Sequence, residues 1–288
     1  KEQYEDFKTR MVEEYNTRTG EELIINSVLK NNGVQEGFTV SPEESGLYPN
    51  VHCVPLYELF KAKGFEAAYK EMVNIMENTK KNTPEMDLEF KIENLFLQII
   101  SSENNKEIME ESPYKVLEGT DLICVYKWVV GYNGRGICNT RIKNSHMVEY
   151  GLDKFSEKEL YDIALKNTQR MFPGVVRDLM EMLGMPLPDE VPLEERMWIV
   201  TNARSINGAT SILYEEVLKE VAEKIGGNFY IIPSSIHEVL CVSERHNDTE
   251  RIKALVGEVN GNIVENHERL SYSVYLYEME SGKIRIAA

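Results

Sequence analysis

Short apolar runs joined by tight turns recur along this chain, and they constrain its fold more than any other feature. The clearest pair is 122–130 and 136–143, which flank the dipeptide Asn133-Gly134. Asn-Gly readily adopts the positive φ angles of a hairpin turn, so this segment predicts two antiparallel strands. Parallel strands need a long crossover between them, and hairpin signals outnumber such crossovers here. We therefore expect an α+β fold with small, mostly antiparallel sheets covered by helices.

The remaining elements follow from the spacing of apolar residues. Short runs bounded by turn residues predict strands over 22–30, 37–41, 51–54, 95–100, 197–201, 229–232 and 239–242, and a closing hairpin over 272–286. Apolar residues three and four apart predict helices over 4–15, 65–76, 160–167, 175–183, 213–225 and 252–259. Ser156 and Glu159 form a capping box that begins one of these helices.

Two features divide the chain into modules. A polar stretch over 78–84 closes a first group of elements, and three prolines crowd a segment that cannot hold regular structure, namely Pro186, Pro188 and Pro192. We expect an N-terminal α+β module over 1–83, a middle one over 84–185 and a C-terminal one over 195–288. Residues 93–169 and 197–260 share the order strand, helix, hairpin, helix, so a degenerate structural repeat is a further hypothesis.

The net charge restricts the partners of the protein. With 48 acidic against 32 basic residues the chain carries −16 at pH 7. This charge would repel the phosphates of nucleic acids and of anionic membranes, so we expect neither as a partner. An acidic surface either keeps a protein soluble or attracts a basic partner, and both interpretations stay open.

The hydropathy pattern predicts a packed protein of the cytoplasm. Hydrophobic residues make up 42% and charged residues 28% of the 288, as is usual for globular proteins. No apolar run approaches the roughly 20 residues that span a bilayer, and the N-terminal segment has no apolar centre like that of a signal peptide. The four cysteines lie too far apart for a disulfide framework or a zinc site, so we expect reduced, buried thiols at Cys53, Cys124, Cys138 and Cys241.

Familiar catalytic motifs are missing from the sequence. It contains no GxxxxGKS or GxxxxGKT loop, no HExxH, no GxSxG and no paired CxxC. His52, His246 and His267 have no companion at metal-ligand spacing. We therefore expect no cofactor and no metal.

The densest polar cluster in an apolar setting lies between two predicted strands and contains Ser234, Ser235, His237 and Glu238. A histidine that exchanges protons and a serine hydroxyl suit acid–base or nucleophilic chemistry. Adjacent residues of a strand point to opposite faces, so we do not expect His237 and Glu238 to pair directly. The other interpretation is a tight turn whose hydroxyls satisfy backbone groups and whose histidine supports the fold.

Two further groups of polar residues end predicted strands just before helices. Asn144 and His146 precede the helix of the middle module, and Asn202 and Asn207 precede that of the C-terminal module. Such positions often bind ligands, because the free amides of a helix N-terminus lie nearby. They equally often hold helix caps or turns.

Several segments together resemble a bacterial family of unknown function, DUF5688. The segments that carry the resemblance are 31–33, Asn144-Ser145-His146-Met147, 205–214 and 227–239. The resemblance implies a bacterial cytoplasmic protein, but the family has no established activity, ligand or catalytic residue. It directs attention to Ser234, Ser235, His237 and Glu238, since a purely structural hairpin has little need of such a polar run.

Two functions are compatible with these features. The first is a non-catalytic cytoplasmic binding or adaptor protein with a protein or small-molecule partner, since no catalytic motif is complete. The second is a hydrolase-type enzyme in which His237 is the general base and Ser234 or Ser235 the nucleophile or substrate-binding hydroxyl, assisted by Glu238 or His146.

Overall fold

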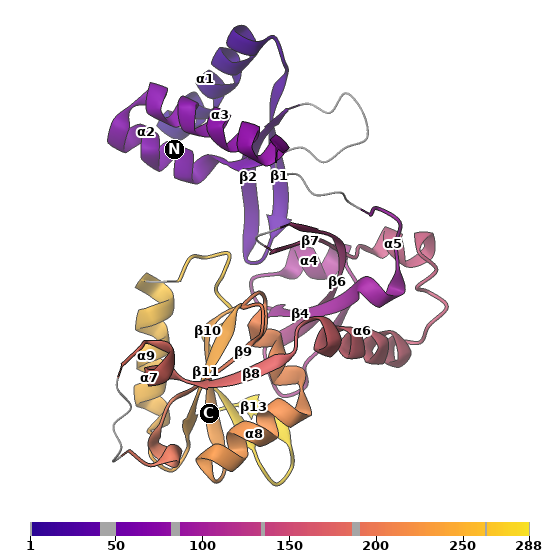
Figure 1. Cartoon of the computed structure of the whole chain (residues 1–288), viewed down its shortest axis with the longest axis vertical. Helices are drawn as coiled ribbons and strands as arrows, with labels where there is room; N and C mark the ends of the chain where they lie inside the picture. The colour runs from indigo at the N-terminus through magenta and orange to yellow at the C-terminus, as the bar shows by residue number, and fades with distance from the viewer. Residues whose placement is uncertain are drawn as a thin grey trace. The chain divides into compact units, whose positions relative to one another are not determined.

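The computed structural model describes residues 2–40, 50–81, 87–133, 136–185, 191–262 and 264–287 (Figure 1). The chain divides into two compact units, Lys1–Glu85 and Met86–Ala288. The middle and C-terminal modules, which the sequence predicts as separate, lie together in the second unit.

The first unit is a three-stranded antiparallel sheet, in the order β1-β2-β3, packed with three helices. Its elements are α1 (Glu2–Thr19), β1 (Leu23–Lys30), β2 (Gly33–Val40), β3 (Val51–His52), α2 (Cys53–Lys63) and α3 (Phe65–Lys81). The apolar stripe predicted on α1 enters this core, where Phe7, Met11 and Tyr15 are buried. The adjacent Lys8 is buried too, and its ammonium pairs with Glu36 at 2.8 Å.

The strand predicted over 51–54 is confirmed only for its first two residues. Residues 51–54 were expected to be extended, but β3 ends at His52 and Cys53 begins α2. Only Cys53 and Leu56 are buried along α2, so its buried apolar stripe is narrow. The spacing of apolar residues therefore did not predict this helix. Pro55 lies in its first turn, where a helix tolerates proline.

Two antiparallel sheets form the second unit. The smaller contains β4, β6 and β5 in that order, with β7 also paired to β6, and the larger has the order β13-β12-β10-β11-β9-β8. The strands are β4 (Leu95–Ser101), β5 (Tyr114–Val116), β6 (Leu122–Asn133), β7 (Gly136–Arg141), β8 (Gly174–Asp178), β9 (Trp198–Asn202), β10 (Phe229–Ser235), β11 (Glu238–Ser243), β12 (Tyr275–Glu278) and β13 (Lys283–Ile286). The antiparallel pairing confirms the predicted α+β class.

Helices connect and cover these strands. They are α4 (Lys106–Glu111), α5 (Asn144–Glu149), α6 (Glu157–Met171), α7 (Leu179–Met182), α8 (Glu215–Ile225) and α9 (Thr249–Asn262), with 3-10 turns η1 (Ile92–Asn94), η2 (Leu193–Glu195) and η3 (Gly208–Leu213). The predicted capping box is confirmed, since the Glu159 carboxylate accepts from Ser156 N at 2.9 Å and Ser156 Oγ accepts from Glu159 N at 3.3 Å. Among the described residues, no helix combines the length and the apolarity needed to cross a membrane.

One hydrophobic core joins the two sheets of the second unit. It contains Leu97 and Tyr126 from the smaller sheet and Val200 and Phe229 from the larger. Strand β8 precedes the proline-rich segment, of which residues 186–190 lie outside the described part, and β8 pairs with β9, which follows it. The residues on either side of that segment therefore share a sheet as well as a core.

The helix predicted over 175–183 is wrong for residues 175–178 and confirmed for Leu179–Met182. Residues 174–178 form the edge strand β8, and only Leu179–Met182 is helical. The β-branched pair Val175-Val176 favours a strand, whereas the wider apolar spacing fits a helix equally well, so periodicity could not decide. Asp178 ends the strand and caps α7, because its carboxylate accepts from Met180 N at 2.8 Å.

The hypothesis of a repeat fails on strand pairing. Both segments contain a strand, a helix, a hairpin and a helix in that order, but the first also has β5 between its helix and its hairpin. However, β4 pairs with the first strand of its hairpin, β6, whereas β9 pairs with the second strand of its hairpin, β11. The paired strands β6 and β7 confirm the predicted hairpin, although Gly134 and Arg135 of its turn lie outside the described residues.

Candidate functional site

Four of the predicted site residues meet where the β10–β11 turn touches the loop after β9. We call this the His237 junction and define it by Thr201, Asn202, Asn207, Gly208, Ser235 and His237. The backbone N–H of Asn207 donates to His237 Nδ1 at 3.1 Å, and Thr201 Oγ1 donates to the carbonyl of His237 at 2.8 Å. Ser235 Oγ accepts from His237 N at 3.0 Å. Every one of these bonds uses a backbone group.

The two asparagines hold the loop between β9 and η3. Asn202 is buried, its Oδ1 accepts from Arg204 N at 3.0 Å and its Nδ2 donates to the carbonyl of Ile206 at 2.8 Å. Asn207 takes a left-handed conformation with φ of 52°, which asparagine tolerates better than most residues. Its Oδ1 accepts from Gln98 Nε2 of β4 at 3.0 Å, so the junction also ties the two sheets together.

Gly208 lies at the tightest point of the junction. A Cβ there would stand 2.2 Å from Thr201 Oγ1, 2.3 Å from the carbonyl oxygen of His237 and 2.9 Å from Asn202 N. Two of these neighbours are backbone atoms and cannot move aside without displacing a strand or the turn. Glycine is therefore required by close approach, although the sequence presents Asn207-Gly208 only as a turn signal.

The hydrogen bonds of His237 define its chemistry. Because Nδ1 accepts the Asn207 N–H, the neutral imidazole carries its proton on Nε2. Nε2 lies 3.6 Å from Glu268 Oε1, and the Glu268 carbonyl accepts from Ile236 N at 2.7 Å. A general base needs a free ring lone pair, and here that lone pair is engaged. Within the described residues, no hydrogen bond joins Ser234 or Glu238 to His237.

The other two predicted residues lie on α5 and make local contacts. His146 Nδ1 accepts from Lys143 N at 3.1 Å, and its ring stacks on Tyr150 with centroids 4.9 Å apart. Asn144 Nδ2 donates to the carbonyl of Glu110 at 2.8 Å. No contact within the described residues joins Asn144 or His146 to the His237 junction, so the two predicted groups do not form one site there.

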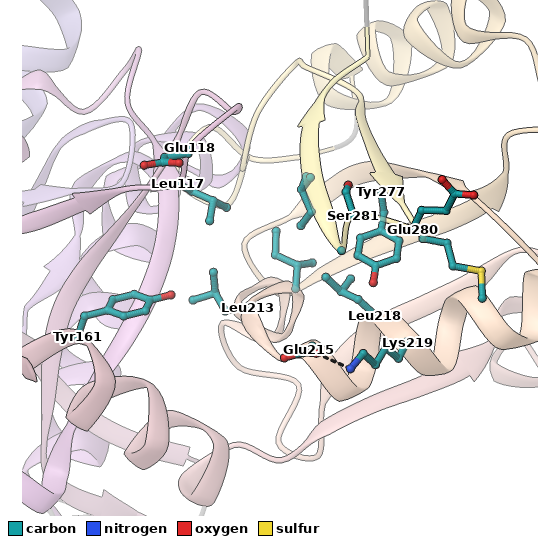
Figure 2. Close-up of a pocket in the computed structure, with 14 residues that line it drawn as sticks. Leu117, Glu118, Tyr161, Leu213, Glu215, Leu218, Lys219, Tyr277, Glu280 and Ser281 are labelled. Carbon is teal, nitrogen blue, oxygen red and sulfur yellow. Dashed lines mark hydrogen bonds and ion pairs between the residues drawn. The ribbon is translucent and has the colours of Figure 1, made fainter. Parts of the chain in front are cut away.

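A pocket of about 550 Å³ in the second unit was not predicted (Figure 2). Eight of its lining residues are apolar or aromatic, and we call this set the floor: Leu117, Tyr161, Ile212, Leu213, Leu218, Tyr277, Met279 and Ile284. Four charged residues also line it, and we call them the rim: Glu118, Glu215, Lys219 and Glu280. Figure 2 shows Tyr161 reaching in from α6, while Tyr277 of β12 approaches from the larger sheet. These residues come from four separate regions of the chain, 117–118, 161, 212–219 and 277–284, which is why no local motif could reveal the pocket.

The rim of the pocket is acidic. Lys219 pairs with Glu215 one helical turn away, which lowers the pKa of Glu215 and raises that of Lys219. Within the described residues, neither Glu118 nor Glu280 has an ion-pair partner. Two carboxylates therefore face solvent beside an apolar floor, and such a surface suits a ligand that combines an apolar group with a positive charge.

A family model matches residues 4–279 and describes a family of unknown function, DUF5688. The chain belongs to this family. The match confirms the resemblance predicted from the sequence, and it covers the His237 junction entirely. No curated protein and no solved structure matches the chain. For this DUF5688 protein, the geometry of the side chains is therefore the guide to function.

The described residues contain no group of three or more His, Cys, Asp or Glu side chains that could hold a metal ion. No disulfide joins the four cysteines, and Cys53, Cys124 and Cys241 are buried, as predicted, whereas Cys138 is half-buried. Burial raises the pKa of Cys53 and of Cys124 to about 12, so both thiols stay protonated and unreactive at neutral pH.

Proposed function

We propose that this protein is a non-catalytic binding protein of the bacterial cytoplasm, and that its binding site is the pocket of Figure 2. The observation that carries the proposal is that eight apolar or aromatic residues line one pocket together with two carboxylates, Glu118 and Glu280, that have no ion-pair partner within the described residues. The ligand is a segment of a partner protein in which a lysine or arginine accompanies an apolar side chain. The net charge of −16 favours such a basic partner over an acidic one.

The pocket supports modest affinity. Burying one leucine-sized side chain contributes about 1.5–3 kcal/mol, and exposed rim charges mainly accelerate association and select the partner. A dissociation constant of 1 μM corresponds to about −8 kcal/mol. A single side chain in the pocket therefore needs help from neighbouring contacts, and we expect affinities on the order of micromolar or weaker.

The hydrolase alternative receives less support from the geometry. It requires His237 to accept a proton from Ser234 or Ser235, but His237 Nδ1 already accepts the Asn207 N–H and Nε2 carries the remaining proton. The Ser235 hydroxyl oxygen itself accepts from the His237 backbone. The polar cluster thus favours a structural role, and the unpaired rim of the pocket favours binding.

Selection from a phage-displayed library of random dodecapeptides tests the proposal. The full-length protein is the bait, and a labelled copy of each enriched peptide is then titrated by fluorescence anisotropy. We expect enriched peptides to carry lysine or arginine near an apolar residue. The Leu213→Arg variant, which places a cation on the pocket floor, should bind them at least tenfold more weakly.

Leu183→Arg is the matched control, since Leu183 is 57% exposed and does not line the pocket. It introduces the same side chain and should leave the affinity unchanged. If no peptide is enriched, or if enriched peptides bind Leu213→Arg as well as they bind the wild type, the pocket is not the binding site.

A further inference from the structure

An uncovered strand edge lies beside the pocket. Strand β5 pairs with β6 on one side, and no other described strand pairs with it. Its side chains are accessible, with Tyr114 40% and Val116 52% exposed. An exposed edge strand offers a row of main-chain donors and acceptors to another chain.

The ladder between β5 and β6 determines which main-chain groups are available. Leu117 N donates to the carbonyl of Leu122 at 3.0 Å, and residue pairs in an antiparallel ladder alternate between bonded and non-bonded. Lys115 therefore belongs to a bonded pair with Cys124. It follows that the N–H and C=O groups of Tyr114 and Val116 point away from β6.

The opposite edge of the same sheet is closed. On β4, Leu97 N donates to Thr168 Oγ1 at 2.9 Å, and Ile99 N donates to Thr210 Oγ1 at 3.2 Å. Side chains from α6 and η3 thus satisfy alternate amides along that strand. The described residues contain no such cover for β5.

Every second side chain of β5 points to the face of the sheet on which the pocket lies. The Lys115 ammonium lies over the ring of Tyr161, 3.8 Å from its centroid, and Tyr161 lines the pocket. Leu117, two residues further along, points to the same face and also lines the pocket. A strand added beside β5 would therefore place every second side chain on the pocket side.

We propose that the partner segment binds as an extended strand that pairs with Tyr114 and Val116 of β5 and inserts an apolar side chain into the pocket. This inference rests on the proposed function. The residue two positions away on the same face, in the direction of Glu118 and away from Lys115, is a lysine or arginine, because the carboxylate attracts it whereas the Lys115 ammonium would repel it. Addition of a strand to a sheet edge combines main-chain affinity with specificity from alternate side chains.

A second copy of this chain is a poorer occupant of the edge. Pairing two β5 strands would bring together two chains that each carry −16, and like charges oppose such association. We expect a monomer at 100 μM in sedimentation velocity. A dimer that the Tyr114→Lys variant abolishes would overturn the proposal and assign the edge to self-association.

Single N-methylation at each residue of an enriched peptide tests the pairing without altering the protein. A methyl group removes one amide donor, so substitution at every second position of the paired segment should weaken binding at least tenfold. The positions between should tolerate it, since their amides face solvent. Alanine substitution in the same peptide identifies the side chain that enters the pocket.

The outcomes separate the two proposals. If methylation is tolerated everywhere, or if sensitive positions recur three or four residues apart as on a helix, strand addition is wrong. The pocket remains the proposed binding site in that case, provided that Leu213→Arg binds the peptide at least tenfold more weakly than the wild type. Hydrogen exchange gives an independent reading, since the bound peptide should slow the amides of Tyr114 and Val116 at least tenfold and leave that of Lys115 unchanged.

Discussion

The His237 junction and the pocket of the second unit differ in what their polar groups contact. At the junction, the side chains of Thr201, Asn202 and His237 all bind backbone groups. At the pocket, the carboxylates of Glu118 and Glu280 have no ion-pair partner among the described residues. Side chains that satisfy the fold are unavailable for ligands, so the pocket is the better candidate for binding even though the junction is more conspicuous in the sequence.

The largest effect should come from Gly208→Ala. The added Cβ would meet the His237 carbonyl at 2.3 Å and Asn202 N at 2.9 Å, and neither backbone group can yield without disrupting the sheet. We expect a loss of about 3 kcal/mol in the free energy of unfolding, measured by urea titration. Gly257→Ala in α9 is the control, because nothing lies within 4 Å of its Cβ and alanine favours a helix by about 1 kcal/mol. Equal stabilities would show that the junction is loosely packed.

Substitution of His237 separates a structural from a chemical role. His237→Ala leaves the Asn207 N–H without its acceptor, and we expect a loss of about 2 kcal/mol by urea titration. His237→Asn keeps an acceptor oxygen near the position of Nδ1 and should recover at least half of that loss. If both variants are as stable as the wild type, His237 does not support the fold and its interpretation as a chemical group gains weight.

Local chemistry explains which parts of the fold the sequence predicts. The hairpin of β6 and β7 and the start of α6 depend on adjacent residues, namely the Asn133-Gly134 step and the Ser156–Glu159 box. The edge strand β8 was misassigned because its short apolar pattern fits a helix as well as a strand. Its identity depends on pairing with β9, which lies beyond the proline-rich segment.

The candidate sites were predictable only in part, for the same reason. Residues 234–238 stand out as a polar cluster, but the partner of His237 is the amide of Asn207, thirty positions away along the chain. Asn207 in turn binds Gln98 on another sheet. The pocket lies beyond such prediction, since its lining extends from Leu117 to Ile284 and only the packing of two sheets brings these residues together.

The pH dependence of stability should report on the packing of β6 around Cys124. Burial raises the pKa of Cys124 to about 12, although the nearby Lys115 acts in the opposite direction. An unfolded cysteine ionises near pH 8.5, so the folded state holds this proton more tightly. The resulting stability is complete below about pH 8.5 and is lost as the pH rises from there towards 12. Each pH unit in that window should cost about 1.4 kcal/mol.

Cys124→Ala isolates this contribution. We expect urea titrations between pH 7.5 and 10.5 to show that the free energy of unfolding falls less steeply with pH in the variant than in the wild type. This difference in slope does not depend on how much the substitution changes stability at neutral pH. Identical slopes would mean that water reaches Cys124, and therefore that the packing of β6 beneath Lys115 and Tyr161 is looser than the structure indicates.

The smallest effect should come from the rim, where Glu280→Gln removes one charge from an exposed turn. The free energy of unfolding should not change measurably, because Glu280 has no ion-pair partner within the described residues. An enriched basic peptide should bind roughly two- to fivefold more weakly, the range typical of a single exposed ion pair. Its affinity should also depend less on salt between 50 and 300 mM NaCl, since one screened interaction is gone.

An unchanged affinity and salt dependence would show that Glu280 is not part of the binding surface. If Glu280→Gln instead lowers the free energy of unfolding, Glu280 stabilises the fold. The rim would then resemble the His237 junction, and the contrast between the two regions would be wrong.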